Sequence, residues 1–306
     1  MSPPRPALES LGEDDDRLYY LDLGGGRLVS NNTEGTDPRV LVTGLVRFPD
    51  GIVVDLARRQ IFWTNMGVPS RNDGSIERID IDGSNRRVIV PEGKTFTPKQ
   101  ITFEPRSRKL YWCDREGMRV MRANADGSGI ETLVQTGEGD EDRKDARRHN
   151  VGIAVDPDRG KIYWTQKGGE NAGEGRIFRA GIELPRGERP DRRSDIELLF
   201  QDLPEPIDLH IDLEHRMLYW TDRGDAPRGN TVNRAPLDAP PSGRRESQVV
   251  VRHLGEAIGI TLDVPNDRMF FTELAGTLYR ANLDGTALRP LLIGQGNLTG
   301  IAYANS

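Results

Sequence analysis

Met217-Leu218-Tyr219-Trp220-Thr221-Asp222 is the stretch that decides the fold, because its pattern occurs six times along the chain. Each copy runs from an apolar residue through an aromatic pair to a small or apolar residue and then to an acid or an amide. The other copies occupy residues 18–22, 61–65, 110–114, 162–166 and 269–273. Consecutive copies start about 43 to 56 residues apart, which is the spacing of four-stranded propeller blades. The repeat therefore predicts six blades, with the aromatic pairs packed between them as core.

Two further elements keep phase with the aromatic pair. A short apolar strand, usually ending in an acid, precedes it at residues 51–55, 100–104, 152–156, 208–212 and 259–263. An alternating strand that carries an arginine follows it. Several of these strands run into an Asp-Gly turn, as at Asp82-Gly83, Asp126-Gly127 and Asp284-Gly285, which suits a tight hairpin. The phase predicts four-stranded antiparallel blades.

The two ends of the chain complete one blade. The chain enters with a second-strand motif at Leu18 to Asp22 and ends with a first-strand motif at Gly300-Ile301-Ala302-Tyr303. We therefore predict an all-β, six-bladed β-propeller whose ring is closed when the C-terminal strand pairs with the N-terminal blade, which removes exposed sheet edges. Residues 17–306 are expected to form this single domain, and residues 1–16 a flexible leader.

Composition narrows the class of protein. Hydrophobic residues make up 35% of the 306 residues, with 34 Gly and 20 Pro, as expected for an all-β chain rich in turns. The net charge is −6, with acids and bases interspersed, so we expect no nucleic-acid partner. No apolar run is long enough to cross a membrane, so we expect no membrane partner.

Cysteine content and the first residues predict the compartment. Cys113 is the single cysteine, so no intramolecular disulfide can form, and the disulfide framework of small secreted modules is excluded. Cys113 replaces the threonine of the motif, and we expect a buried structural thiol. Residues 1–16 lack the apolar core of a secretory signal, so a cytoplasmic protein is predicted.

Loops that vary in length between blades are where function is expected. Residues 66–74, 135–150, 167–175 and 223–230 should lie on one face of the ring, around its axis. The charged segment 136–148 suggests a mobile stretch beside the axis, either a lid or a solvated loop. The insertion 185–195 should lie on the opposite face and be solvated.

The position before the glycine of each first strand should approach the axis. It is polar in three blades, at Thr299, Asp50 and Lys99, and apolar in the other three, at Val151, Ile207 and Ile258. Gln100 and Asp208 replace the glycine itself. One to three residues further out lie Phe48, Asn150, Glu205, Glu256 and Asn297. Met66 and His149 belong to the loops expected on the same face. Such a mouth predicts a site for small-molecule substrates, one of them apolar.

Histidine is the residue most often used for acid and base chemistry near neutral pH, and the chain has four. His149 and His253 precede first strands, at the expected mouth. His210 lies inside a first strand and could reach the core or the channel. His215 should lie in a surface turn on the opposite face.

The six motifs resemble the YWTD repeat of low-density-lipoprotein-receptor class B propellers, and the resemblance covers nearly the whole chain. Those receptor domains are extracellular and bind proteins, whereas this chain has no disulfide. Its architecture is also similar to that of the fungal hetero-Diels-Alderases of tropolone-sesquiterpenoid biosynthesis. That resemblance implies a pericyclase of secondary metabolism that dehydrates a tropolone precursor to a quinone methide and joins it to a humulene-type sesquiterpene. The reaction needs no metal or redox cofactor.

Roles for the mouth residues follow from this hypothesis. Lys99, Gln100, His149 and Asn150 would polarise or protonate the tropolone, and Asp50 or Asp208 would take up a proton. The substrate contacts would come from Phe48, Met66, Val151, Ile207, Ile258, Glu256, Asn297 and Thr299.

Two other functions stay open. The chain also resembles six-bladed calcium-dependent lactonases and esterase-type hydrolases, and in that case Asn150, Asp208, Glu256 and Asn297 would supply oxygen ligands to an axial ion. The third hypothesis is a propeller that binds proteins without catalysis. An axial ion, a deep half-apolar pocket or a closed mouth would distinguish the three.

Overall fold

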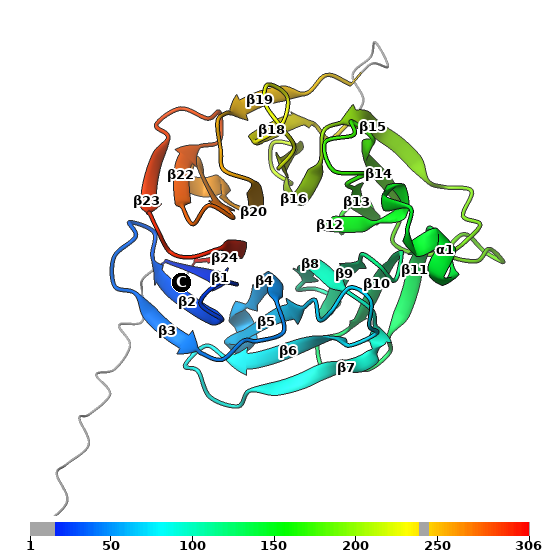
Figure 1. The fold of residues 1–306 in the computed structure, drawn as a ribbon, viewed down its shortest axis with the longest axis horizontal. Coiled ribbons are helices and arrows are strands. Elements are labelled where there is room, and N and C mark those ends of the chain that lie inside the picture. Colours follow the sequence, from blue (N-terminus) through cyan, green and yellow to red (C-terminus); the bar gives the residue numbers. More distant parts are fainter. Residues whose placement is uncertain (1–15, 239–244, 306) are drawn as a thin grey trace, which may run out of the picture.

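The computed structural model describes residues 16–238 and 245–305. In these residues, six four-stranded antiparallel sheets surround a central axis (Figure 1). The predicted six-bladed propeller is therefore confirmed. The expected leader lies almost wholly outside the described residues.

The strands of each blade run from the axis outward. The innermost strands are β4 (Pro49–Asp55), β8 (Pro98–Glu104), β12 (Asn150–Asp156), β16 (Pro206–Asp212), β20 (Ala257–Asp263) and β24 (Leu298–Ala304). The second strands, which carry the aromatic motif, are β1 (Arg17–Asp22), β5 (Gln60–Asn65), β9 (Lys109–Asp114), β13 (Lys161–Gln166), β17 (Met217–Asp222) and β21 (Arg268–Glu273).

The third strands are β2 (Arg27–Asn32), β6 (Gly74–Asp80), β10 (Arg119–Asn124), β14 (Gly175–Gly181), β18 (Thr231–Pro236) and β22 (Leu278–Asn282). The outer strands are β3 (Arg39–Val42), β7 (Arg87–Thr95), β11 (Glu131–Gln135), β15 (Glu197–Leu203), β19 (Gln248–Val251) and β23 (Arg289–Leu292). The short helices are α1 (Gly139–Arg143), η1 (Leu56–Arg58), η2 (Ala146–Arg148) and η3 (Val264–Asn266). No helix among the described residues has the length and apolar character needed to span a bilayer.

The ring is closed by strands from the two ends of the chain. β24 pairs antiparallel with β1, with Leu18 opposite Tyr303 and Tyr20 opposite Ile301. Strand β24 thereby becomes the innermost strand of the blade that β1 to β3 begin (Figure 1). The predicted closure is confirmed, and β24 covers the inner edge that β1 would otherwise leave unpaired.

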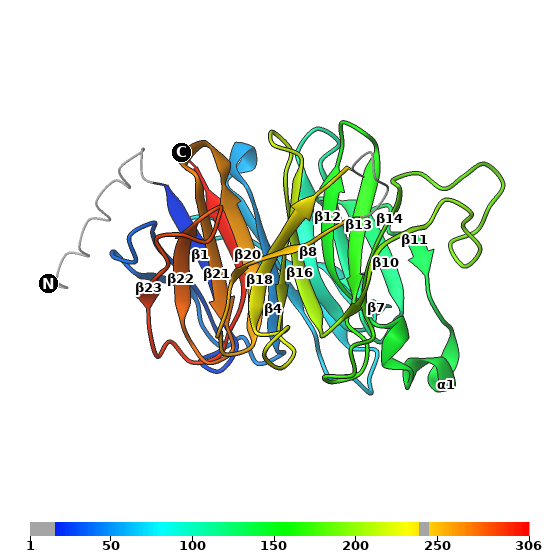
Figure 2. The same cartoon turned by 90° about the horizontal axis from the view of Figure 1, so that it is seen from above.

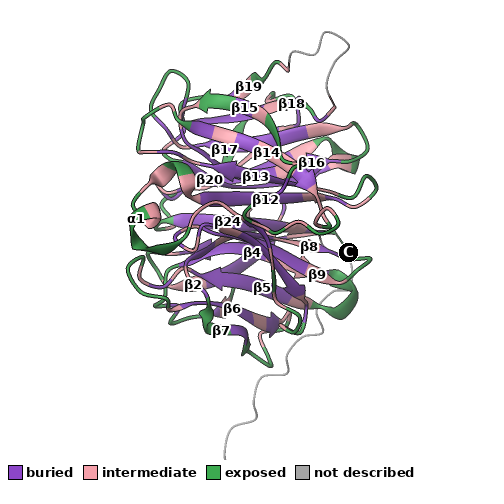
Figure 3. Cartoon of the chain, turned by 90° about the vertical axis from the view of Figure 1, so that its right-hand side faces the viewer, coloured by how far each residue is buried: buried purple, intermediate pink, exposed green. Residues whose placement is uncertain are grey.

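The aromatic motif forms the core between blades, as predicted. Trp63, Trp112, Trp164 and Trp220 are at most 1% exposed, and the buried strands stand out against the exposed loops (Figure 3). Phe62 of β5 and Trp112 of β9 belong to one buried cluster, which joins two neighbouring blades. An aromatic side chain buries roughly 150–250 Å², and at about 25 cal/mol per Å² each contributes about 4–6 kcal/mol before entropic costs.

In four of the six blades, the threonine of the motif links the blade to the next one. The pairing of β12 with β13 shifts register between Asn150 and Ile153, which interrupts the backbone ladder at Gly152. Thr165 Oγ1 accepts the N–H of Gly152 at 2.7 Å and donates to the carbonyl of Ile207, in the next blade, at 2.8 Å. The equivalent donor and acceptor contacts are made by Thr64, Thr221 and Thr272. The motif therefore supplies both the core and the hydrogen bonds between inner strands.

Cys113 stands at the threonine position of β9. It is fully buried, and its Sγ lies 3.1 Å from the carbonyl oxygen of Gly152 in the next blade. Burial raises the pKa of the thiol well above its usual value. The predicted buried structural thiol is confirmed.

Acids that end the innermost strands hold the neighbouring blade. Asp55 accepts from Arg108 at 2.7 Å, and Asp156 accepts from Arg216 at 2.7 Å. Both arginines come from the following blade, just before its aromatic motif. Asp212 instead accepts from the exposed His215 at 2.8 Å, so the surface position predicted for this histidine is confirmed. These acids are structural.

The insertion between β14 and β15 does not simply extend into solvent, as we expected for residues 185–195. The side chain of Arg193 is 0% exposed and pairs with Asp195 at 2.8 Å. It also donates to the carbonyl of Leu133 at 2.9 Å, while the carbonyl of Pro190 accepts the N–H of Gln135 at 2.9 Å. The insertion covers the outer edge of β11, so that expectation was wrong. An uncovered sheet edge would otherwise be open to pairing with another chain.

Candidate functional site

The axis of the ring has two different ends. We call the end where the innermost strands begin the entry face, around Asp50, Lys99 and Val151. The end where they finish, around Glu104, Pro157 and Leu213, is the exit face. Seen from the side, α1 lies at the entry face and the C-terminus at the exit face (Figure 2).

Side chains fill the hub at the entry face. Val151, Ile207 and Ile258 are 0%, 3% and 4% exposed and form one buried cluster. On the polar side, Lys99 Nζ lies 2.7 Å from Asp50 Oδ1, with 12% and 2% of the two side chains exposed. Thr299 is 2% exposed and donates to the carbonyl of Pro49 at 3.1 Å. The predicted ring of three polar and three apolar residues is present. Its side chains pack against one another and do not line an open mouth.

Close approach of the backbones explains why side chains fill the hub at the entry face. We call these packed side chains the plug. A Cβ at Gly152 would lie 2.1 Å from the carbonyl oxygen of Ile207 on the next innermost strand. No side chain fits at that distance. Because the innermost strands lie this close together, the side chains that precede this position extend toward the axis. They fill the space there.

The carboxylate of Asp50 contacts two other polar side chains of the plug, Lys99 and Gln100. Gln100 Nε2 donates to its second carboxylate oxygen at 3.1 Å, and Met66 Sδ lies 3.1 Å from Lys99 Nζ. Burial lowers the pKa of Lys99, while the Asp50 carboxylate acts in the opposite direction. The structure thus brings together four residues that the sequence singled out: Asp50, Met66, Lys99 and Gln100.

The remaining predicted entry-face residues have other contacts. His149 Nε2 lies 2.8 Å from the carbonyl oxygen of Arg143 in α1, and burial lowers its pKa. Asn150 is fully buried and donates to Thr136 Oγ1 at 3.1 Å. Both hold the 136–148 segment against its blade.

Two rim residues and Phe48 remain. Asn297 is exposed and donates to the carbonyl of Leu274 at 2.8 Å. Glu256 is exposed, and Phe48 is 48% exposed. None of these three side chains belongs to the buried plug.

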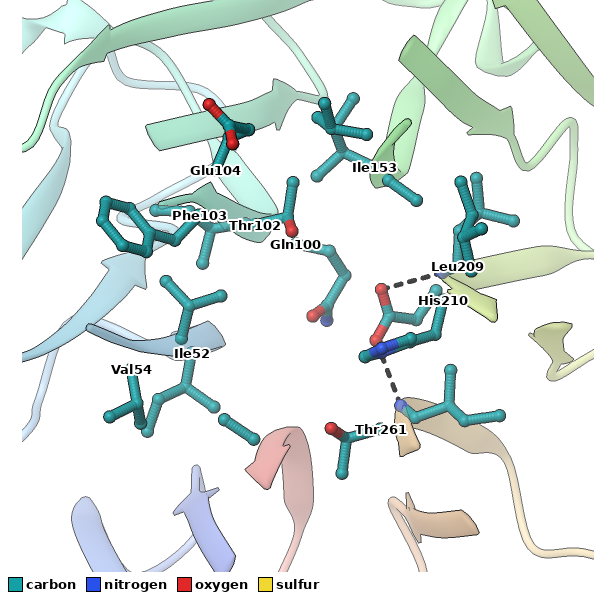
Figure 4. A pocket seen from close by; sticks show the side chains of 18 of the residues that line it. Ile52, Val54, Gln100, Thr102, Phe103, Glu104, Ile153, Leu209, His210 and Thr261 are labelled. Atoms are coloured by element: carbon teal, nitrogen blue, oxygen red, sulfur yellow. Dashed lines mark hydrogen bonds between the residues drawn. The ribbon is translucent and has the colours of Figure 1, made fainter. Parts of the chain in front are cut away.

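An open axial cavity of about 360 Å³ lies on the exit-face side of the hub. All six innermost strands line it, and apolar walls include Ile52, Val54, Ile153 and Leu209 (Figure 4). The polar side chains that line it are those of Gln100, Thr102, Glu104, Arg106, Asp208, His210, Thr261 and Tyr303. The open end of the axis is therefore the exit face and not the entry face, where the loop lengths had placed the mouth.

Asp208 and His210 are two of the titratable residues that line this cavity, together with Glu104, Arg106 and Tyr303. Asp208 is 7% exposed, and its oxygens accept the N–H groups of Leu209 at 2.9 Å and Ile260 at 3.1 Å. Burial nevertheless raises the pKa of Asp208 to about 8. Burial lowers the pKa of His210 to about 4. At neutral pH the cavity therefore holds a carboxylic acid that is mostly protonated and a neutral imidazole.

From the sequence, His210 could lie either in the core or in the channel. The structure places it in the lining of the axial cavity. His210 is two residues after Asp208, so both side chains lie on the same side of β16. The same register in the other blades carries Val53, Thr102, Ala154, Thr261 and Ala302. Comparing that register across the six repeats would have shown one histidine among small and aliphatic residues.

The four oxygen ligands considered for calcium do not form a common site. Asp208 is in the exit-face cavity and is bonded to backbone N–H groups. Asn150 is bonded to Thr136 and Gln166, while Glu256 and Asn297 are exposed on the entry rim. Within residues 16–238 and 245–305, no group of three or more His, Cys, Asp or Glu side chains is placed to hold a metal ion. These residues do not fit an axial calcium ion.

Comparison with known proteins finds relatives along the full length of the chain. No family model matches it. A Pyricularia oryzae protein named low-density lipoprotein receptor-related protein 1 is 44% identical over 304 residues, which cover 94% of this chain and 97% of that protein. A Cochliobolus heterostrophus protein named 3-hydroxyacyl-CoA dehydrogenase-like protein LAM1 is 36% identical over 321 residues, covering 99% of this chain and 67% of that protein.

Solved structures show the same fold at low identity. The nidogen/laminin complex contains a chain with a TM-score of 0.71 and 19% identity, covering 94% of this chain and 98% of that one. A gluconolactonase from Xanthomonas campestris has a TM-score of 0.59 and 20% identity, covering 84% and 78%. At this identity the likeness establishes the propeller fold alone.

Proposed function

The chain belongs to the same family as the Pyricularia oryzae low-density lipoprotein receptor-related protein 1, a family of six-bladed propellers with YWTD-like repeats, and on that premise we propose that it is a small-molecule enzyme of secondary metabolism. The observation that carries the proposal is the exit-face cavity. Its volume of about 360 Å³ falls within the usual range for ligand pockets. It combines aliphatic walls with the imidazole of His210 and the carboxyl groups of Asp208 and Glu104. The dehydrogenase-like name of the Cochliobolus relative further supports an enzyme.

The reaction we propose is a cofactor-free pericyclic one, a hetero-Diels-Alder addition. Protonated Asp208 donates its proton to the hydroxyl of a tropolone precursor, and the C–O bond breaks as water leaves. His210 accepts the proton that the tropolone ring loses, which leaves a neutral quinone methide. The alkene of a humulene-type terpene then adds across it, forming two bonds without any change of oxidation state. Proton return from His210 to Asp208 restores the enzyme.

The cavity supports this chemistry physically. A buried acid with a pKa of about 8 remains protonated at neutral pH and can donate, which an ordinary aspartate cannot. Aliphatic walls such as Ile52, Ile153 and Leu209 would hold the hydrocarbon and exclude water, and holding two reactants together removes much of the entropic barrier.

The proposal keeps Gln100 and Asp208 from the residues expected at the site and adds His210. In it, Asp50 and Lys99 close the far end of the cavity, and His149 and Asn150 position the 136–148 segment. The expected substrate contacts of Phe48, Met66, Val151, Ile207, Ile258, Glu256, Asn297 and Thr299 stay untested predictions, as do the cytoplasmic location and the kind of partner.

Product formation from a tropolone precursor and humulene, followed by liquid chromatography and mass spectrometry, tests the proposal. Asp208→Asn and His210→Phe should each lower turnover by about 100-fold, a typical contribution of a positioned acid or base. His215→Phe is the matched control, because this exposed histidine lies outside the cavity. It should leave turnover unchanged.

Folding of each variant is checked by near-ultraviolet circular dichroism before turnover is compared. Folded Asp208→Asn and His210→Phe proteins with wild-type turnover would remove the exit-face cavity from the reaction. A wild-type protein that does not accelerate the addition over the buffer reaction would refute the pericyclase.

A further inference from the structure

A second pocket, away from the axis, lies between the η2 segment and β14. Its volume is about 400 Å³, and three arginines line it together with one aspartate. Arg147 and Arg148 come from η2, while Arg176 comes from β14. Thr136 and Gln166 complete the wall. The pocket thus joins the charged 136–148 segment to the blade beneath it.

The pocket lining contains fewer carboxylate groups than guanidinium groups. Asp145 is the one acid in the lining, and it is already paired with Arg147 at 2.8 Å. Arg148 lies 3.6 Å from Asp145 and 3.4 Å from Asp142. Arg176 has no ion pair with any described residue, and its Nη2 donates only to the carbonyl of Arg147 at 2.6 Å. Positive charge therefore exceeds negative charge in the pocket.

Arg176 also stands out among the described arginines whose buried Nε has no hydrogen-bond partner. Five arginines there have a buried Nε without a hydrogen-bond partner: Arg17, Arg78, Arg148, Arg176 and Arg179. Four of the five have a carboxylate elsewhere on the guanidinium, and Arg176 does not. Its guanidinium carbon instead lies 5.3 Å from the centre of the Phe178 ring. Burial lowers the pKa of Arg176, and the nearby Arg147 adds to this effect.

A partly buried guanidinium without a counter-ion is costly, because desolvation is not offset by pairing. The three arginines meet two carboxylates, Asp145 and Asp142, so Arg176 is left without an ionic partner and can take a phosphate oxygen. Guanidinium groups bind phosphate oxygens in pairs with good geometry. A carboxylate offers two acceptor oxygens to the three guanidinium groups, whereas a phosphate group offers at least three.

We propose that this pocket binds the phosphate group of a small molecule through Arg147, Arg148 and Arg176. The bound group bridges η2 and β14, and so holds the 136–148 segment on its blade. The site is separate from the exit-face cavity and does not depend on the reaction proposed there.

Calorimetric titration of the whole protein with inorganic phosphate tests the site. The wild type should bind phosphate saturably, and Arg176→Gln should bind at least about tenfold more weakly, since one charge-assisted contact is lost. Arg147→Gln, whose side chain is 59% exposed in the wild type, should weaken binding similarly without affecting folding. Arg192→Gln is the matched control, because it removes the same charge from an 84% exposed side chain.

Further titrations identify the source of the phosphate group. Tighter binding of pyrophosphate than of phosphate would indicate a diphosphate ligand, and tighter binding of glycerol phosphate a monoester. Acetate binding as tight as phosphate would overturn the assignment. So would a wild type that does not bind phosphate, or equal affinity in Arg176→Gln and the wild type.

Discussion

Thr165→Val should destabilise the propeller by about 2–6 kcal/mol, although valine has nearly the same shape as threonine. Thr165 is fully buried, and its hydroxyl accepts from Gly152 at 2.7 Å and donates to Ile207 at 2.8 Å. The register shift at Gly152 leaves its N–H outside the regular ladder. Each buried backbone group that loses its partner costs about 1–3 kcal/mol, and two are lost.

Urea denaturation of the purified protein measures this loss as a shift of the midpoint at constant slope. Thr165→Ser is the matched control, because serine keeps the hydroxyl and removes one methyl group, at a cost of about 1 kcal/mol. Valine should therefore be clearly worse than serine. The reverse order would show that packing, and not the hydrogen bonds, accounts for the threonine, and would refute the reasoning.

Four other outcomes are expected. Removal of residues 299–306 should abolish cooperative unfolding in near-ultraviolet circular dichroism, because β24 closes the ring; a cooperative transition would contradict this role. Arg193→Ala should cost about 3 kcal/mol in urea denaturation, since Asp195 loses its fully buried partner; a loss below about 1 kcal/mol would argue against it. The pKa of Asp208 is raised on folding to about 8 from its usual value of 3.8, so its contribution to stability is greatest below pH 4 and falls by about 1.4 kcal/mol per pH unit up to pH 8. Asp208→Asn should therefore gain stability relative to the wild type as the pH rises over that window. A difference in melting temperature between the two proteins that does not change with pH would contradict the raised pKa. Cys113 should resist iodoacetamide in the folded protein and react after unfolding, as mass spectrometry would show, because it is buried and its pKa is raised.

Much of the architecture could be predicted because the residues that shape each blade lie within a single repeat. Residues 217–222 place an aromatic pair for the core and a threonine for the bond between blades within one short strand. Both requirements are local, so they recur visibly along the chain. Pairing of β24 with β1 was also predictable, because the two ends each supply a part that the other lacks.

Some side-chain contacts could not be predicted, and two of these cases share a cause. Lys99 and Asp50 were expected to face a substrate, and they bind each other at 2.7 Å. Arg193 was expected in solvent, and it is buried against Leu133, 60 residues away in sequence. In both cases the partner lies in another blade, so the local pattern does not show it.

The number of blades, their strand order and the buried aromatic core follow from the repeat alone, since each depends on residues close together in sequence. The closure of the ring follows because each end of the chain supplies the part of a blade that the other lacks. Which end of the axis is open does not follow from the repeat. That depends on how closely six innermost strands approach, as at Gly152 and Ile207, where backbones 55 residues apart nearly touch. The same close approach packs the entry-face side chains into a plug and leaves Asp208 and His210 facing the cavity at the other end.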